Sequence, residues 1–189
     1  MKHPTSQELY AYWQERRGDR PAPERAEIEP GPIRQVLSDI FILALDRWAG
    51  HPFRLAGTRV CALFDRELKG ERFVELWAAA SRPGVSDLLT ILKDEQVGTV
   101  AGVTGQTANG DPLELELLLL PLAAARSNLA RAIGVLVPFG TPERIGANPI
   151  GSLTIGPCRH IGASIEKRRL PRLLAPRQRR LSIVASGRP

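Results

Sequence analysis

Residues that could carry out chemistry are few and scattered in this chain of 189 residues. Ser152 and Asp111 have no neighbouring pattern of a nucleophile and its base. Cys158 and His160 form the one close Cys/His pair, whereas structural zinc usually needs four such ligands. No glycine-rich segment has the spacing that cradles phosphate. The pattern predicts no catalytic residue, no cofactor-binding residue and no metal site, and it favours a protein that is not an enzyme.

Composition limits the domain size and the cellular compartment that we expect for the chain. Apolar residues make up 43% of it, enough for the core of one compact domain. The longest apolar run, Leu117–Ala125, is far shorter than the roughly 18–20 residues that span a bilayer. The N-terminus lacks the basic-then-apolar pattern of a signal peptide. Two cysteines, Cys61 and Cys158, fit a reducing compartment, although a disulfide between them stays open. We expect a cytoplasmic protein.

The positive charge is concentrated at the C-terminal end. Residues 166–189 hold eight Lys/Arg and one Glu, whereas residues 1–165 hold 18 Lys/Arg and 19 Asp/Glu. Three interpretations of this basic tail stay open. It is a solvated end without a partner, or a polybasic segment that attracts nucleic acid or anionic membrane. Alternatively, Arg168 and Arg172 have the Arg-x-x-x-Arg spacing of PilZ-type cyclic-dinucleotide receptors, but the accompanying Asp/Asn-x-Ser-x-x-Gly pattern is missing.

The remaining residues predict helices between two groups of strands. A capping box of Thr5 and Glu8 favours a helix over residues 5–17. Asn109-Gly110 predicts a hairpin turn, because Asn-Gly accepts positive φ at low cost. The predicted strands are 39–46, 53–56, 98–107, 113–122 and 132–139, with short helices over 58–77 and a longer one over 86–94. Segments 152–155 and 160–165 are predicted to form a small extra pair or loops, and Arg126-Ser127-Asn128 a turn.

Composition shifts divide the chain into four parts. Residues 1–32 hold the N-terminal helix and a Pro-rich link, and residues 33–140 hold the core. A Gly/Pro-rich extension follows over 141–165, and the basic tail occupies 166–189. The order of strands, helices and strands predicts an α+β domain with one antiparallel sheet.

The stretch 54–77 is the most distinctive part of the sequence. Arg54-Leu55-Ala56-Gly57-Thr58 is followed by Phe64-x-Arg66-Glu67-Leu68, Gly70 and Phe73-x-x-Leu76-Trp77. Gly57 suits a sharp turn, and Thr58 is predicted to cap the next helix. This arrangement resembles a bacterial single-domain branch of the PAS superfamily, with Arg54, Ala56, Gly57, Thr58 and Trp77 as the motif. The Tyr12-Trp13 helix and the tail are similar too.

The resemblance implies a PAS-like five-stranded antiparallel sheet with short helices over one face, preceded by an N-terminal helix. It also implies a non-enzymatic sensor or regulatory module that acts by protein–protein interaction in signal transduction. Haem-binding members carry a histidine on the long helix before the third strand, and flavin photosensors carry Asn-Cys-Arg-Phe-Leu. The 86–94 helix has no histidine, and Cys61 stands in Val-Cys-Ala-Leu-Phe. No haem or flavin cofactor is therefore expected.

Two surfaces are candidates for function. A small apolar ligand could bias the domain from a pocket beneath the helices, and plain core packing is the alternative for the same residues. The candidate pocket residues are Cys61, Phe64, Phe73, Leu76, Trp77, Val100, Val103, Leu117, Leu119, Val135 and Val137. Tyr12 and Trp13 could form a partner surface if exposed, or pack on the chain's own sheet. Expected partners are regulatory proteins, signalling kinases among them, or a second copy in a homodimer.

Overall fold

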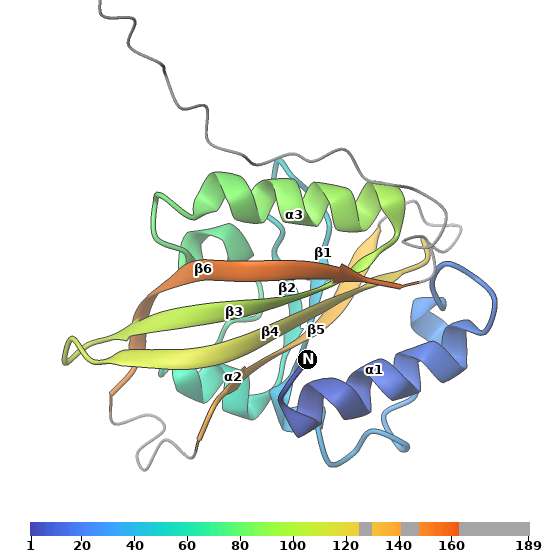
Figure 1. The fold of residues 1–189 in the computed structure, drawn as a ribbon, viewed down its shortest axis with the longest axis horizontal. Helices are drawn as coiled ribbons and strands as arrows, with labels where there is room; N and C mark the ends of the chain where they lie inside the picture. The colour runs from blue at the N-terminus through green and yellow to red at the C-terminus, as the bar shows by residue number, and fades with distance from the viewer. Residues whose placement is uncertain (125–129, 141–147, 163–189) are drawn as a thin grey trace, which may run out of the picture.

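The computed structural model describes residues 1–124, 130–140 and 148–162. These residues form an N-terminal helix, one sheet and a small group of helices (Figure 1), so the α+β prediction is confirmed. The helices are α1 (Pro4–Arg17), α2 (Thr58–Leu63) and α3 (Arg82–Glu95), with 3₁₀ turns η1 (Arg25–Glu27), η2 (Leu37–Asp39) and η3 (Phe73–Leu76). The strands are β1 (Ile40–Ala44), β2 (Phe53–Ala56), β3 (Gly98–Thr107), β4 (Pro112–Leu122), β5 (Arg131–Pro138) and β6 (Ile150–Ile161).

The sheet has six strands in the order β2-β1-β5-β4-β3-β6, and every neighbouring pair is antiparallel. The prediction of five strands was therefore one short. Residues 150–161 form one strand that follows β3 from Thr107 to Gly98, whereas segments 152–155 and 160–165 were predicted as a small extra pair or loops; residues 163–165 lie outside the described residues. Gly156-Pro157 interrupts its apolar pattern at a bulge, and a Cβ on Gly156 would lie 2.9 Å from the Gly102 carbonyl oxygen. Glycine thus lets the two backbones approach where the pattern breaks.

Alternating side chains give the sheet two buried faces. On β4, Leu115, Leu117 and Leu119 face α2, η3 and α3, whereas Leu118 and Leu120 face α1. Figure 1 shows α3 and α1 on opposite sides of the sheet. The short helices therefore cover one face, as was predicted, and the N-terminal helix covers the other. Both faces are inaccessible over the centre of the sheet.

Two helices begin earlier than predicted. The cap of α1 is His3, whose Nδ1 accepts the Thr5 N–H at 3.2 Å, rather than Thr5 itself. Pro4 occupies the first helical position, where a backbone N–H would have no acceptor within the helix, so proline loses no hydrogen bond. The same reasoning explains α3, where Pro83 lies in the first turn, so that the helix begins at Arg82 rather than at the predicted residue 86.

Candidate functional site

The motif stretch contains most of the edge strand β2, then α2 and η3, which form a layer over one face of the sheet. Gly57 is the cap residue of α2, and its N–H donates to the Ile40 carbonyl oxygen at 2.8 Å. A Cβ there would lie 2.3 Å from the Ser38 carbonyl oxygen, so only glycine fits. Thr58 is the first residue of α2 and makes no capping bond, which corrects its predicted role. Arg54 and Thr58 are exposed, whereas Ala56 packs against the buried cluster.

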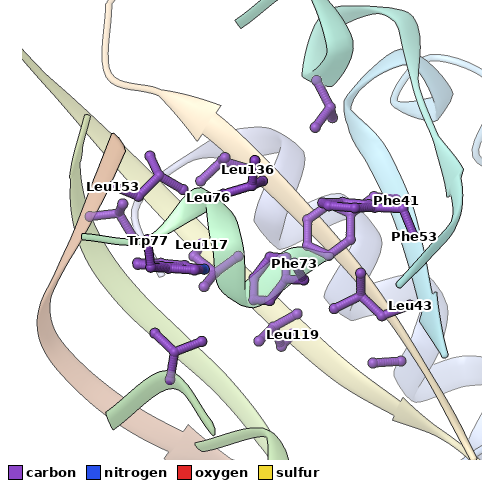
Figure 2. Close-up of a cluster of buried hydrophobic side chains, with 14 of the residues drawn as sticks. Phe41, Leu43, Phe53, Phe73, Leu76, Trp77, Leu117, Leu119, Leu136 and Leu153 are labelled. Atoms are coloured by element: carbon purple, nitrogen blue, oxygen red, sulfur yellow. The ribbon is translucent and has the colours of Figure 1, made fainter. Parts of the chain in front are cut away.

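Four aromatic rings form a continuous row beneath this layer, with Phe41, Phe53 and Phe73 as a triangle at one end and Trp77 at the other. Phe41 of β1 lies 5.6 Å from Phe53 and 5.8 Å from Phe73, between ring centroids. Phe73 in turn lies 5.6 Å from Trp77. Figure 2 shows the row running from Phe41 through Phe73 toward Trp77, above Leu117 and Leu119 of β4. The row links the β1–β2 edge of the sheet to the edge at β6, where Trp77 forms a bridge to Leu153.

The candidate pocket residues divide between the two faces of the sheet. Phe64, Phe73, Leu76, Trp77, Val103, Leu117 and Leu119 share one buried cluster, and Cys61 packs at its margin. Val100, Val135 and Val137 lie in the other cluster, beneath α1, which corrects their placement. Strand alternation explains the error, because Val100 and Val103 are an odd number of residues apart and must face opposite ways. On β3 and β5, the neighbouring residues Ala101 and Leu136 face α2, η3 and α3 instead.

Sequence reasoning missed further members of the same cluster. Phe41, Leu43, Phe53, Leu89, Leu136 and Leu153 were not among the predicted pocket residues. Alternation along β1 and β5 could have identified Phe41, Leu43 and Leu136. Leu153 required the knowledge that β6 joins the sheet.

Trp77 brings one polar atom into this apolar cluster. Its side chain is 1% exposed, and its Nε1–H has no acceptor within the described part of the chain. The other buried tryptophan, Trp13, donates its Nε1–H to the Pro121 carbonyl oxygen at 2.8 Å. Buried indole N–H groups usually find such a partner. Among the described residues, the buried Trp77 Nε1–H is therefore a donor without an acceptor.

Cys61 lies at the edge of the cluster, with its Sγ 3.7 Å from Glu67 Oε1 and 4.0 Å from the Ala56 carbonyl oxygen. Burial is the main cause that raises the pKa of the Cys61 thiol, and the Glu67 carboxylate adds to it. The protonated thiol is a poor nucleophile and a poor metal ligand. Cys61 thus acts here as a small, mostly apolar side chain. Both cysteines are free thiols, and Cys158 is exposed on β6.

The β1–β2 loop presents one aromatic side chain to solvent. Trp48 is 93% exposed, and the loop beneath it is ordered by Asp46, whose Oδ1 accepts the Trp48 and Ala49 N–H groups. His51 is buried at the base of the loop with φ of 55°. Burial lowers the pKa of His51; Lys93 and Arg47 act in the same direction, and Asp46 opposes them.

Tyr12 and Trp13 hold α1 on the sheet and do not form a surface. Both side chains are buried, which corrects the suggestion of a partner surface there. The Tyr12 hydroxyl accepts the Glu29 N–H at 2.8 Å, and Trp13 bonds to Pro121 as described above. Tyr12 and Trp13 instead pack on the chain's own sheet, which was the alternative prediction.

Several predicted features lie outside the described residues. These are the turn at Arg126-Ser127-Asn128, residues 141–147 of the Gly/Pro-rich extension and the basic tail with Arg168 and Arg172. Within the described ranges, no helix has the length and apolarity to cross a membrane. Those ranges also contain no group of three or more His, Cys, Asp or Glu side chains that could hold a metal ion.

The fold and motif can now be compared with known proteins. No curated protein matches the chain. Among solved structures, the PAS domain of an HTR-like protein from Haloarcula marismortui is similar, with 16% identity and a TM-score of 0.41 over 56% of this chain and 88% of that one. A family model described as "PAS domain" matches residues 1–137. Because that match covers more than half of its length, the chain belongs to the PAS domain family, whose members are sensory and regulatory modules.

Proposed function

We propose that this protein is a cytoplasmic, non-enzymatic PAS regulator whose output is contact with another protein. The observation that carries this proposal is the family match over residues 1–137. PAS domains are typically sensory modules without catalysis of their own. A small apolar ligand that binds two conformations with different affinity would shift the balance between them and so change the contact.

The β1–β2 loop is our proposed contact surface, in place of Tyr12 and Trp13. Trp48 stands out into solvent beside the exposed Arg47. Tryptophan and arginine are the residue types that most often dominate binding energy at protein interfaces. The Asp46 bonds order the backbone of the loop, so little backbone freedom is lost on binding. The partner class is a regulatory protein such as a signalling kinase, or a second copy of this chain.

In-cell photo-crosslinking tests this proposal. A photoreactive phenylalanine analogue replaces Trp48, and the same analogue replaces the exposed Thr90 of α3 as a control. A crosslink to a signalling protein at position 48 but not at position 90 supports the regulator. A crosslink to the chain itself supports a homodimer. The absence of any crosslink specific to position 48 would remove this loop as the contact surface.

Mass spectrometry of freshly purified protein tests whether the protein retains a small ligand. Extra mass that appears in the native spectrum and disappears under denaturing conditions indicates a retained ligand. An unliganded native spectrum favours a docking module that works without one.

A second candidate function rests on the charge of residues 166–189, which hold eight Lys/Arg and one Glu. This segment would attract nucleic acid, anionic membrane or a cyclic dinucleotide. Such binding would weaken steeply as salt rises. It would also be lost when residues 166–189 are removed, and equal binding by the truncated protein would exclude it.

A further inference from the structure

His51 is a buried histidine at the base of the β1–β2 loop, and one nitrogen of its ring has no partner. The side chain is 4% exposed, and Nδ1 makes no hydrogen bond to any of the described residues. In the neutral ring the proton can sit on Nε2, so that Nδ1 need not donate. A protonated ring carries a charge and a second N–H at Nδ1, and both would be buried without a partner. The site therefore suits the neutral form of His51.

The charges around His51 do not offset this cost. Burial is the main cause that lowers the pKa of His51. The Asp46 carboxylate opposes that effect, whereas Lys93 of α3 and Arg47 of the loop add to it. The ring is thus placed between two cations and one carboxylate, in addition to being buried. A proton on His51 is disfavoured by its neighbours as well as by the loss of water.

The backbone of His51 joins the loop to η3. Its N–H donates to the Asp46 carbonyl oxygen at 2.8 Å, and its own carbonyl oxygen accepts the Phe73 N–H at 3.3 Å. Its φ is 55°, a conformation that few non-glycine residues adopt. On the η3 side, the exposed Arg72 pairs with Glu75 at 3.0 Å, so that carboxylate is already occupied. A His51 ring that moves out to water would disturb both backbone bonds.

Asp46 connects His51 to the exposed Trp48. Its Oδ1 accepts the Trp48 N–H at 3.0 Å and the Ala49 N–H at 3.2 Å. A protonated His51 would attract the Asp46 carboxylate, and the two loop N–H groups would lose part of their acceptor. If the ring moves out instead, the His51 N–H that holds the Asp46 backbone moves with it. Either response loosens the backbone beneath Trp48.

We propose that His51 is a pH-sensitive latch for the β1–β2 loop: its neutral form holds the loop in the conformation described, and its protonation releases the loop together with Trp48. In the open loop the ring is in water and binds a proton with its ordinary affinity, so acid favours the open state. Contact through Trp48 is then weakest at acid pH, because binding must order the loop again. This inference rests on the proposed function and deepens it, since it assigns a regulation to the proposed contact surface.

Amide hydrogen exchange in the ¹⁵N-labelled full chain, followed by NMR from about pH 7.5 to about pH 5, tests the latch. The readouts are the protection factors of the Trp48 and Ala49 N–H groups, corrected for the intrinsic pH dependence of exchange, and the titration of the His51 ring. As pH falls, both protection factors should decrease about tenfold, with the midpoint of the His51 titration. The Leu118 N–H in the centre of β4 should stay protected. Unchanged loop protection, or a loss that Leu118 shares, would overturn the proposal.

Two histidine substitutions separate the latch from other titrating groups. His51→Asn tolerates the positive φ and removes the titration, so loop protection should no longer depend on pH. His160→Asn is the matched control, because His160 lies on β6 with its Nδ1 3.0 Å from Thr99 Oγ1, and the loop should respond to pH as before. A pH response that persists in His51→Asn would contradict the assignment. If that variant does not fold, the coincidence of the two midpoints in the unsubstituted protein still decides the matter.

Failure of the latch can be told apart from failure of the proposed function. If loop protection does not depend on pH but position 48 crosslinks to a signalling protein, the contact surface exists without this control. If the loop opens at acid pH but no crosslink is specific to position 48, the latch exists without the proposed contact.

Discussion

Substitution of Gly57 by alanine is the most direct test of how the motif builds the fold. The added Cβ would lie 2.3 Å from the Ser38 carbonyl oxygen and 2.6 Å from the Leu37 carbonyl oxygen. Both are backbone atoms, so no side chain can rotate away to make room. Either η2 or the start of α2 must move. The movement separates the Gly57 N–H from the Ile40 carbonyl oxygen, now 2.8 Å apart, and Arg59 from the buried Asp39, now 3.0 Å apart.

The size of the effect follows from these contacts. The lost backbone hydrogen bond contributes about 1 kcal/mol. The ion pair adds at most about 1 kcal/mol, because Arg59 is largely exposed and water screens its charge. Overpacking of a rigid site costs roughly 1–3 kcal/mol. We therefore expect Gly57→Ala to lower the free energy of unfolding by about 2–4 kcal/mol, and the melting temperature by roughly 5–15 °C.

Urea unfolding followed by circular dichroism measures this loss. Gly84→Ala is the matched control, because Gly84 lies in α3 and a Cβ there meets nothing within 4 Å. The control should be neutral or gain about 0.5–1 kcal/mol from the higher helix propensity of alanine. If Gly57→Ala unfolds within about 0.5 kcal/mol of the unsubstituted protein, the close approach of Gly57 to Ser38 does not constrain the fold as argued here.

Three further results are expected. Trp13→Phe should lower the free energy of unfolding by about 1–3 kcal/mol in the same urea assay, because it leaves the buried Pro121 carbonyl oxygen without its donor; an unchanged midpoint would contradict this. Burial lowers the pKa of His51 in the folded protein below its ordinary value of 6.5. With respect to this group, the folded state is therefore most stable above pH 6.5. The free energy of unfolding should fall as pH decreases from 6.5 toward the lowered pKa. His51→Asn, which tolerates the positive φ, should reduce this pH dependence in urea midpoints measured between pH 7.5 and pH 5, and an equal dependence in both proteins would refute the assignment. A thiol reagent should modify the exposed Cys158 quickly and Cys61 slowly, so Cys158→Ser should remove the fast phase; two equal rates would show that the Cys61 thiol is not protected by burial.

Local patterns predicted most of the core strands. β2 and β3 have the predicted bounds, and Gly110 adopts φ of 89° in the predicted hairpin turn. These features depend on near neighbours in sequence, such as Asn109-Gly110 or an alternating run. β6 was not predicted as one strand, because Gly156 and Pro157 break its alternation and only pairing with β3 carries the strand across the break.

The candidate site was predicted less well, for a geometric reason. A list of apolar residues does not specify which face of a strand each one occupies. Val135 and Leu136 are neighbours of similar chemistry, yet they contribute to different buried clusters. The unpaired Trp77 N–H could not be predicted at all, because an unmade hydrogen bond depends on every backbone and side-chain acceptor around the ring. The burial of Trp13 likewise depends on β4, more than a hundred positions away.

That last separation has a consequence for how the protein emerges from the ribosome. Trp13 and its acceptor Pro121 are 108 positions apart, and the Lys2 N–H is 114 positions from the Glu116 carboxylate that accepts it. At a synthesis rate of roughly 5–20 residues per second, the apolar face of α1 waits about 5–20 s before β4 has been made. Leu9 and Trp13 therefore lack their contacts with β4 during that interval. During that interval the nascent chain exposes these apolar side chains, to which a holding chaperone can bind.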